Sequence, residues 1–287
     1  MKIGISNSAA RAKWGEERYK RLKALGFDCY DFGMMNTDGP WYTLDDESFV
    51  EALLNEKRLA DEAGISIWQV HGPWRYPPAD ATEEDRAERI EKMQRSIRAA
   101  AILGAKYWVV HPIMPCGTSD IVTGGAEQTW QLNLKFMREL LKTAKAENVI
   151  ICLENMPFVN FSLSTPSDIL SLIKEINDPH FAMCLDTGHS NIYADWPPAR
   201  AMRECGEYVK ALHVHDNRGH NDEHLLPFFG TTDWTDFSAA LAEVGFDGVV
   251  SLECAPSASL PTEIFDDMCA SYAKVARFIA EHNKSHT

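Results

Sequence analysis

Short apolar runs alternate with segments of helical periodicity from one end of the 287-residue sequence to the other. Most of the runs lack a polar residue at every second position, which is typical of strands buried on both faces of a sheet. Eight strands are predicted, over residues 2–6, 27–31, 65–71, 107–111, 149–154, 181–186, 209–214 and 248–253. The pattern therefore indicates an α/β protein with a parallel sheet.

Helical segments fill the gaps between these strands. Apolar residues repeat every three or four positions within residues 90–100, 130–144 and 265–279, so that each segment carries one apolar stripe. Thr165 followed by Pro166 is typical of a helix start, and Gly64 and Gly104 stand where a helix should end. Eight strand–helix units predict a single-domain (β/α)8 TIM barrel over residues 1–287, with a doubly wound open sheet as the alternative.

The amino-acid composition limits the classes of binding partner that the chain can have. The chain has 28 Lys and Arg against 42 Asp and Glu, a net charge of −14, which disfavours a nucleic acid partner. No apolar stretch approaches the about 20 residues that span a bilayer, so no membrane partner is predicted. The N-terminus lacks a signal-peptide pattern, and the seven cysteines form no Cys-x-x-Cys pair. We expect a cytoplasmic protein, and a homo-oligomer is compatible with the sequence.

Four chemically similar residues each close a predicted strand: Glu154, Asp186, His213 and Glu253. A carboxylate or imidazole in that position is costly to bury without a partner, and the C-terminal strand ends are where barrel enzymes build their sites. Convergence on one divalent cation resolves that cost, whereas separate salt bridges are the alternative. Carboxylates with one imidazole suit Mn²⁺, Mg²⁺, Co²⁺ or Zn²⁺.

Further candidates belong to the same rim of the predicted barrel. They are His71 and His111 at strand ends, His189 three residues after Asp186, and Asp222 and His224 in the loop after the seventh strand. Each is a candidate for contact with substrate or metal, while a hydrogen-bonded rim residue is the alternative. His215 is expected to lie behind the site or at the surface.

The motifs that carry these residues resemble, in their order and spacing, the xylose-isomerase-like barrel superfamily of sugar isomerases and epimerases, inosose dehydratases and endonuclease IV-type apurinic nucleases. They are Val70-His71-Gly72-Pro73, Leu153-Glu154-Asn155, Cys184-Leu185-Asp186-Thr187-Gly188-His189, His213-Val214-His215-Asp216-Asn217, Asp222-Glu223-His224 and Leu252-Glu253. The resemblance implies one divalent metal held by Glu154, Asp186, His213 and Glu253. It also implies that Glu154 and Glu253 serve as acid and base, and that His189 contacts substrate.

These observations predict a metal-dependent isomerase or epimerase of a ketose or polyol, which moves a proton through an enediolate that the metal stabilises, without an organic cofactor. The predicted substrate-binding residues are His71, His111, His189, His224, Trp14 and Trp74, and Asp222 and His224 are candidates for an additional metal. Trp14, Trp41, Trp74 and Phe158 fall in predicted loops, where they could stack on a sugar or simply pack. The absence of a Gly-rich phosphate cradle favours a non-phosphorylated substrate.

Three alternatives remain open. A keto-sugar dehydratase shares the first proton transfer, so the sequence does not separate it from an epimerase. The nine ligand types of the nuclease branch all have counterparts, in His71, His111, Glu154, Asp186, His189, His213, Asp222, His224 and Glu253. A nuclease would also need basic residues facing phosphates, and the acidic balance counts against it. A non-catalytic sugar-binding barrel would be expected to lack one of the four strand-end residues, and none is missing.

Overall fold

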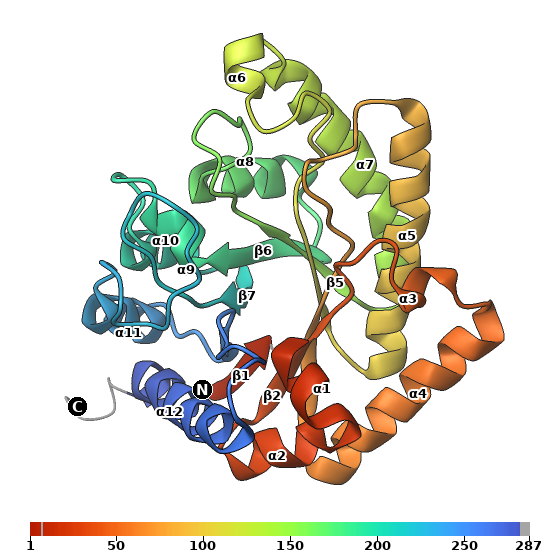
Figure 1. Cartoon of the computed structure of the whole chain (residues 1–287). Helices are drawn as coiled ribbons and strands as arrows, with labels where there is room; N and C mark the ends of the chain where they lie inside the picture. Colours follow the sequence, from red (N-terminus) through yellow and green to blue (C-terminus); the bar gives the residue numbers. More distant parts are fainter. Residues whose placement is uncertain (7, 282–287) are drawn as a thin grey trace.

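The computed structural model describes residues 1–6 and 8–281, and it has eight parallel strands, each followed by a helix (Figure 1). The strands are β1 (Lys2–Ser6), β2 (Cys29–Gly33), β3 (Ser66–His71), β4 (Tyr107–Val110), β5 (Ile150–Glu154), β6 (Phe181–Asp186), β7 (Val209–His213) and β8 (Val249–Leu252). Their order in the sheet is β7-β6-β5-β4-β3-β2-β1-β8, and all pairs are parallel.

A bridge between Val214 and Leu252 joins the two ends of this sheet. The Val214 amide donates to Ser251 O at 2.8 Å, and the Glu253 amide donates to Val214 O at 3.0 Å. The sheet therefore closes, which confirms the TIM barrel and shows that the open sheet was wrong. The predicted domain bounds, 1–287, stay a prediction, because residues 7 and 282–287 lie outside the described part.

Helices surround the barrel, with α4, α5 and α7 along one side in Figure 1 and α10, α11 and α12 along another. The α-helices are α1 (Ser8–Trp14), α2 (Arg18–Ala24), α3 (Pro40–Thr43), α4 (Asp46–Ala63), α5 (Glu83–Leu103), α6 (Asp120–Thr123), α7 (Ala126–Ala146), α8 (Pro166–Ile176), α9 (Thr187–Asn191), α10 (Pro198–Cys205), α11 (Trp234–Glu243) and α12 (Thr262–Glu281). In the described part of the chain, every helix is too short or too polar to cross a bilayer.

The predicted helix ends are confirmed. The Thr165 side chain accepts the Asp168 amide in a capping box, with Pro166 as the first residue of α8. Gly64 and Gly104 end α4 and α5 with φ of 69° and 76°, a left-handed conformation that glycine adopts without strain. At these glycines the chain reverses direction after the helix, which sets where the next strand begins.

The barrel interior is lined with small residues below the strand ends. Val109, Cys152, Ala182, Cys184 and Ala211 form a buried cluster separate from the larger core, which holds the apolar residues of the helices. Cys152, Cys184 and Ala211 each precede a candidate site residue by two positions, so they share its face of the strand. The polar residues therefore stand on a narrow packed interior at the C-terminal end of the barrel.

Candidate active site

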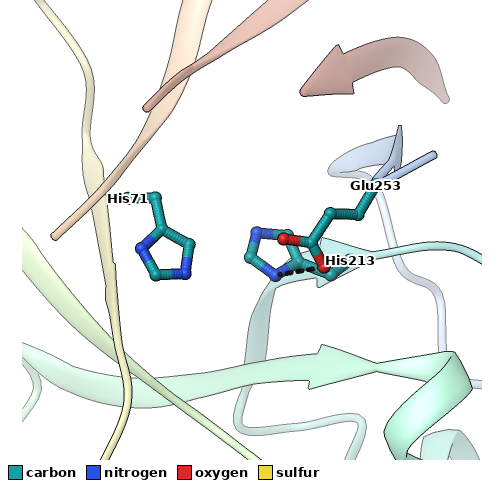
Figure 2. Close-up of side chains that lie close together, drawn as sticks. All are labelled: His71, His213 and Glu253. Carbon is teal, nitrogen blue, oxygen red and sulfur yellow. Dashed lines mark ion pairs between the residues drawn. The ribbon is translucent and has the colours of Figure 1, made fainter. Parts of the chain in front are cut away.

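Three of the four predicted metal ligands converge directly. His213 Nδ1 lies 3.1 Å from Glu154 Oε1 and 3.4 Å from Glu253 Oε2. Figure 2 shows the Glu253 carboxylate beside His213, with the His71 imidazole facing them. The rings of His71 and His213 are nearly parallel, at 9°, with centroids 5.5 Å apart. Strands β3, β5 and β7 and the residue after β8 thus deliver four polar groups to one point.

Asp186 joins this centre less directly. Its Oδ1 accepts the His189 amide at 2.6 Å, which caps α9, and its Oδ2 lies 3.1 Å from His215 Nε2. The link to the centre is His189, whose Nδ1 lies 3.6 Å from Asp186 Oδ1 and 3.5 Å from Glu154 Oε1. The predicted ligand therefore lies at the site, with both of its oxygens already engaged by neighbouring groups.

His215 is fully buried behind Asp186, which fits its predicted supporting position and excludes the surface. A Cβ added at Gly188 would lie 1.9 Å from the His215 ring carbon Cε1. Only glycine at position 188 leaves room for this imidazole against Asp186. Packing therefore explains the glycine of the Asp-Thr-Gly-His motif, and the position of Asp186 and His189 at the site explains its polar residues.

The donor set around Glu154 fits a divalent cation. His111 Nε2 and His71 Nε2 lie 3.2 Å and 3.6 Å from Glu154 Oε2. The Glu154 carboxyl is 1% exposed, yet neither oxygen has a hydrogen-bond partner among the described residues, nor do His71 Nε2 and His213 Nδ1. Orphaned buried polar atoms are costly, and a bound cation would satisfy them. Ligand atoms of His71, His111 and Glu154, and of His71, His213 and Glu253, lie close enough to share one ion.

The loop after β7 adds a second layer to the site. Asp222 Oδ2 lies between two imidazoles, 3.3 Å from His189 Nε2 and 3.1 Å from His224 Nε2. His224 also stacks on His215, with centroids 4.1 Å apart, and its Nδ1 lies 2.7 Å from Glu253 O. The predicted residues Asp222 and His224 are therefore brought to the centre. Whether they hold an additional metal stays a prediction.

A buried carboxylate that sequence reasoning missed holds this loop in place. Asp216 is fully buried and accepts five N–H groups, from the amides of Asn217, Phe228, Gly230 and Thr232 and from Trp234 Nε1, at 2.8–3.2 Å. These donors span the loop that carries Asp222 and His224. The sequence signal was the acidic residue after His215, which had no assigned role.

Asp31 is the second missed residue. It lies in β2, is 3% exposed, and one of its oxygens accepts Gln69 Nε2 at 2.9 Å and the Ser251 hydroxyl. Its other oxygen has no partner among the described residues. Burial raises the pKa of Asp31 to about 7. The signal was available, because Asp31 also closes a predicted strand in the same way as the four ligand candidates.

The two catalytic candidates differ in their preference for a proton. Burial favours the neutral form of Glu154, but His213 and His111 outweigh this and hold its pKa well below the ordinary value. Burial raises the pKa of Glu253, and the charge of Glu154 adds to that despite the opposing effect of His213. Carboxyls whose pKa values are pushed apart are typical of acid–base pairs. Burial also lowers the pKa of His111 to about 4.

His189 has the opposite balance. Burial disfavours its charged form, but Asp186 and Asp222 outweigh the burial and raise the pKa of His189 to about 10. The imidazole is therefore a cation at neutral pH. Both N–H groups of this imidazolium face acceptors, Nδ1 at 2.8 Å from Asn155 O and Nε2 at 3.3 Å from Asp222 Oδ2, so the ring is held in one orientation beside the centre.

A cavity of about 290 Å³ opens above these groups. Polar residues form its floor, namely His111, Glu154, His189, Asp222, His224 and Glu253. Apolar residues form its wall, namely Met35, Trp74, Tyr76, Met156, Pro157 and Phe158. Among the residues that the structure describes around this cavity there is no Lys or Arg. The cavity therefore offers no guanidinium or ammonium group for a phosphate.

Most predicted substrate-binding residues line the cavity or its base, and one does not. His111, His189, His224 and Trp74 line it, and His71 lies at the candidate metal centre. Trp14 instead ends α1, packs on Phe265 of α12 with centroids 4.9 Å apart, and donates from Nε1 to Asp266 at 3.1 Å. The placement of Trp14 in a loop was wrong, because the helix begins directly after β1 and turns this ring onto α12. Trp41, in α3, likewise packs on Phe32.

Comparison with known proteins decides the family. A family model described as xylose isomerase-like TIM barrel matches residues 19–277. The chain belongs to this family. Its xylose isomerase-like relatives include the D-psicose 3-epimerase of Ruminiclostridium cellulolyticum, which is 27% identical over 266 residues, 88% of this chain and 83% of that protein. The 3-dehydro-D-guloside 4-epimerase of Escherichia coli is 23% identical over 278 residues, 94% of this chain and 98% of that protein.

A solved structure has the same fold. The crystal structure of D-psicose 3-epimerase with D-tagatose, from Clostridium cellulolyticum, has a TM-score of 0.75 at 20% identity. The alignment covers 97% of this chain and 99% of that chain. The predicted resemblance to xylose-isomerase-like barrels is confirmed.

Proposed function

We propose that the chain is a divalent-metal-dependent sugar epimerase, which inverts the carbon beside the carbonyl of a keto sugar. It is an enzyme of the sugar isomerase and epimerase kind, as its named relatives are. The observation that carries the proposal is the pair Glu154 and Glu253, whose carboxylates both approach His213 Nδ1, at 3.1 Å and 3.4 Å.

Epimerisation removes a proton from one face of a carbon and returns one to the other face. In the proposed assignment one glutamate of the pair accepts the proton from one face of the carbon, and the other supplies a proton to the opposite face. The reverse reaction exchanges these roles. A divalent cation held by Glu154, His213 and Glu253, with Asp186 completing the set, would stabilise the negative charge that develops on the carbonyl oxygen.

The remaining floor residues bind and orient the sugar. His189 contacts the sugar, and Asn155 O and Asp222 hold its imidazole in one orientation. The absence of Lys and Arg from the lining supports a non-phosphorylated substrate. It also counts against an apurinic nuclease, which would need cations facing the phosphate backbone.

Turnover in D₂O tests the proposal. The protein is loaded with Mn²⁺ or Co²⁺ and incubated with D-psicose, D-tagatose and keto-glycosides, and the products are followed by NMR. We expect an epimer that carries deuterium at the inverted carbon, and chelation should abolish its formation. An absence of any epimer from metal-loaded protein would refute the proposal.

Glutamine variants test the residue assignment. Glu154→Gln and Glu253→Gln each remove a proton carrier while keeping the side-chain size, so turnover should fall by about 10²-fold or more. Glu139→Gln, on the surface of α7, is the matched control and should leave turnover unchanged. Turnover that survives both active-site substitutions would remove the two glutamates from the proton transfer.

A further inference from the structure

The cavity above the strand ends has two chemically different halves, and the proposed reaction uses only one of them. Every ionisable group lies in the floor or is a phenol, while Met35, Trp74, Met156, Pro157 and Phe158 supply apolar surface. A free monosaccharide presents hydroxyls around most of its ring. A single ring whose reacting carbons sit on the polar floor can stack one C–H face on this surface, but the surface also continues outward to Tyr76, which is exposed.

We propose that the apolar wall is an outer subsite for a second ring, so that the preferred substrate is a keto-sugar glycoside rather than a free monosaccharide. The second ring is attached through the anomeric oxygen and presents a flat, uncharged face, either an aryl group or a pyranose. The inference rests on the proposed function for the identity of the reacting sugar. The position and chemistry of the outer subsite rest on the cavity alone.

Aromatic residues lead from the centre to solvent along one loop. The Trp74 ring stands edge-on to His111, with centroids 4.5 Å apart, and Tyr76 follows two residues later. His111 is buried, Trp74 is half-buried, and Tyr76 is 69% exposed. The wall therefore continues outward from the reacting centre, which is the direction in which a substituent on the sugar would extend.

A second loop completes the mouth of the cavity. Phe158, between β5 and α8, lies opposite Tyr76 with the two rings inclined by 21° and their centroids 6.3 Å apart. Val159, the next residue, is 62% exposed. Aromatic rings stack on the C–H face of a pyranose or on an aryl ring, and either occupant would cover surface that otherwise faces water.

The loop that carries Trp74 is braced before any ligand arrives. Asp80 and Arg89 form a buried ion pair, and Asp80 Oδ2 also accepts the Met114 amide at 2.8 Å. The Arg89 guanidinium lies 5.9 Å from the centre of the Trp74 ring, and the Trp74 amide donates to Met35 O at 3.0 Å. A wall that is already fixed binds a second ring with little ordering cost.

Calorimetric titration of the Mn²⁺-loaded protein tests the subsite with three non-reacting probes, methyl β-D-glucopyranoside, phenyl β-D-glucopyranoside and cellobiose. We expect the phenyl glucoside, cellobiose or both to bind about tenfold more tightly than the methyl glucoside. A preference for the phenyl probe alone assigns an aryl group to the outer subsite, and a preference for cellobiose alone assigns a sugar.

Alanine variants locate the preference. Tyr76→Ala and Phe158→Ala should each reduce it while leaving the methyl glucoside affinity within about twofold. Phe229→Ala is the matched control, because Phe229 is also 69% exposed but does not line the cavity. Equal affinities for the three probes, no measurable binding of any of them, or a preference that survives both substitutions would overturn the outer subsite.

These measurements involve no turnover, so the two proposals fail separately. Loss of the preference in an active epimerase refutes the outer subsite and leaves the reaction standing. A retained preference in a protein that epimerises no keto sugar refutes the reaction, while the second-ring subsite stands.

Discussion

Replacing Asp31 with asparagine should make the metal-free protein more stable at alkaline pH, by an amount that depends on pH. Asp31 lies inside the barrel beneath His213 and Glu253, where its carboxyl accepts Ser251 and Gln69 and has no cationic partner at hydrogen-bond distance among the described residues. Burial raises its pKa from 3.8 to about 7. The folded protein must therefore bury a charge whenever the pH exceeds that value.

The sign follows from proton binding. Below about pH 4 the carboxyl is protonated in both the folded and unfolded states and contributes no pH dependence. Between pH 4 and about pH 7 the folded state holds a proton that the unfolded state has released, so the free energy of unfolding falls as pH rises. A rise in pKa from 3.8 to about 7 corresponds to roughly 4 kcal/mol at 1.36 kcal/mol per pH unit, an upper bound on the cost.

Urea unfolding at several pH values between 4 and 8, in the presence of a chelator, measures this cost. The free energy of unfolding of Asp31→Asn minus that of the wild type should increase with pH across the interval, by up to about 4 kcal/mol. Asparagine keeps an oxygen for Ser251 and Gln69, so most of its packing cost is independent of pH. A difference that is flat, or that decreases with pH, would refute the reasoning.

Asp28→Asn is the control, because its effect on the free energy of unfolding should have the opposite sign. Partial burial of Asp28 is outweighed by the Ile3 amide and Arg277, which lower its pKa. The stability that this carboxylate contributes is present above its unfolded pKa and is lost as pH falls. The variant should therefore be less stable than the wild type at pH 8, and the deficit should shrink toward acid pH.

Three further substitutions test particular contacts. Gly188→Ala places a methyl group 1.9 Å from the His215 ring, so activity should fall at least tenfold and stability should drop by about 1–3 kcal/mol; wild-type kinetics would show that the ring can move aside. Asp216→Asn turns an acceptor into an N–H group among five donors, so KM should rise and urea stability should fall by about 1–3 kcal/mol or more, and an unchanged KM would contradict its role in placing the loop. Trp14→Phe keeps the packing on α12 and loses one hydrogen bond, so kcat and KM should stay within about twofold, and a large change in KM would return Trp14 to the substrate site.

The fold could be predicted because strands buried on both faces and glycine-terminated helices leave a periodic signal in the chain. The positions of Glu154, His213 and Glu253 followed from the same signal, since parallel strand ends meet at one rim of a barrel. Side-chain direction in the loops carries no such signal. The engagement of Asp186 by His215 depends on contacts between residues far apart in sequence, so the structure was needed to find it.

The five N–H groups that donate to Asp216 could not be found from the sequence either, because only the folded loop brings them together. Asp31 was missed for a different reason. It closes a predicted strand as the ligand candidates do, but it faces the interior at a level below them, and the level of a residue along the barrel axis depends on strand register.

The division of the cavity into floor and wall allows substrate size and reaction chemistry to change independently, both in evolution and in engineered variants. Most of the groups proposed to transfer protons and to hold a metal stand at strand ends, where a change in length would disturb pairing around the whole barrel. The wall comes from three connections, those after β2, β3 and β5, which tolerate insertion and exchange. A library confined to those segments should diversify substrate size while retaining the reaction.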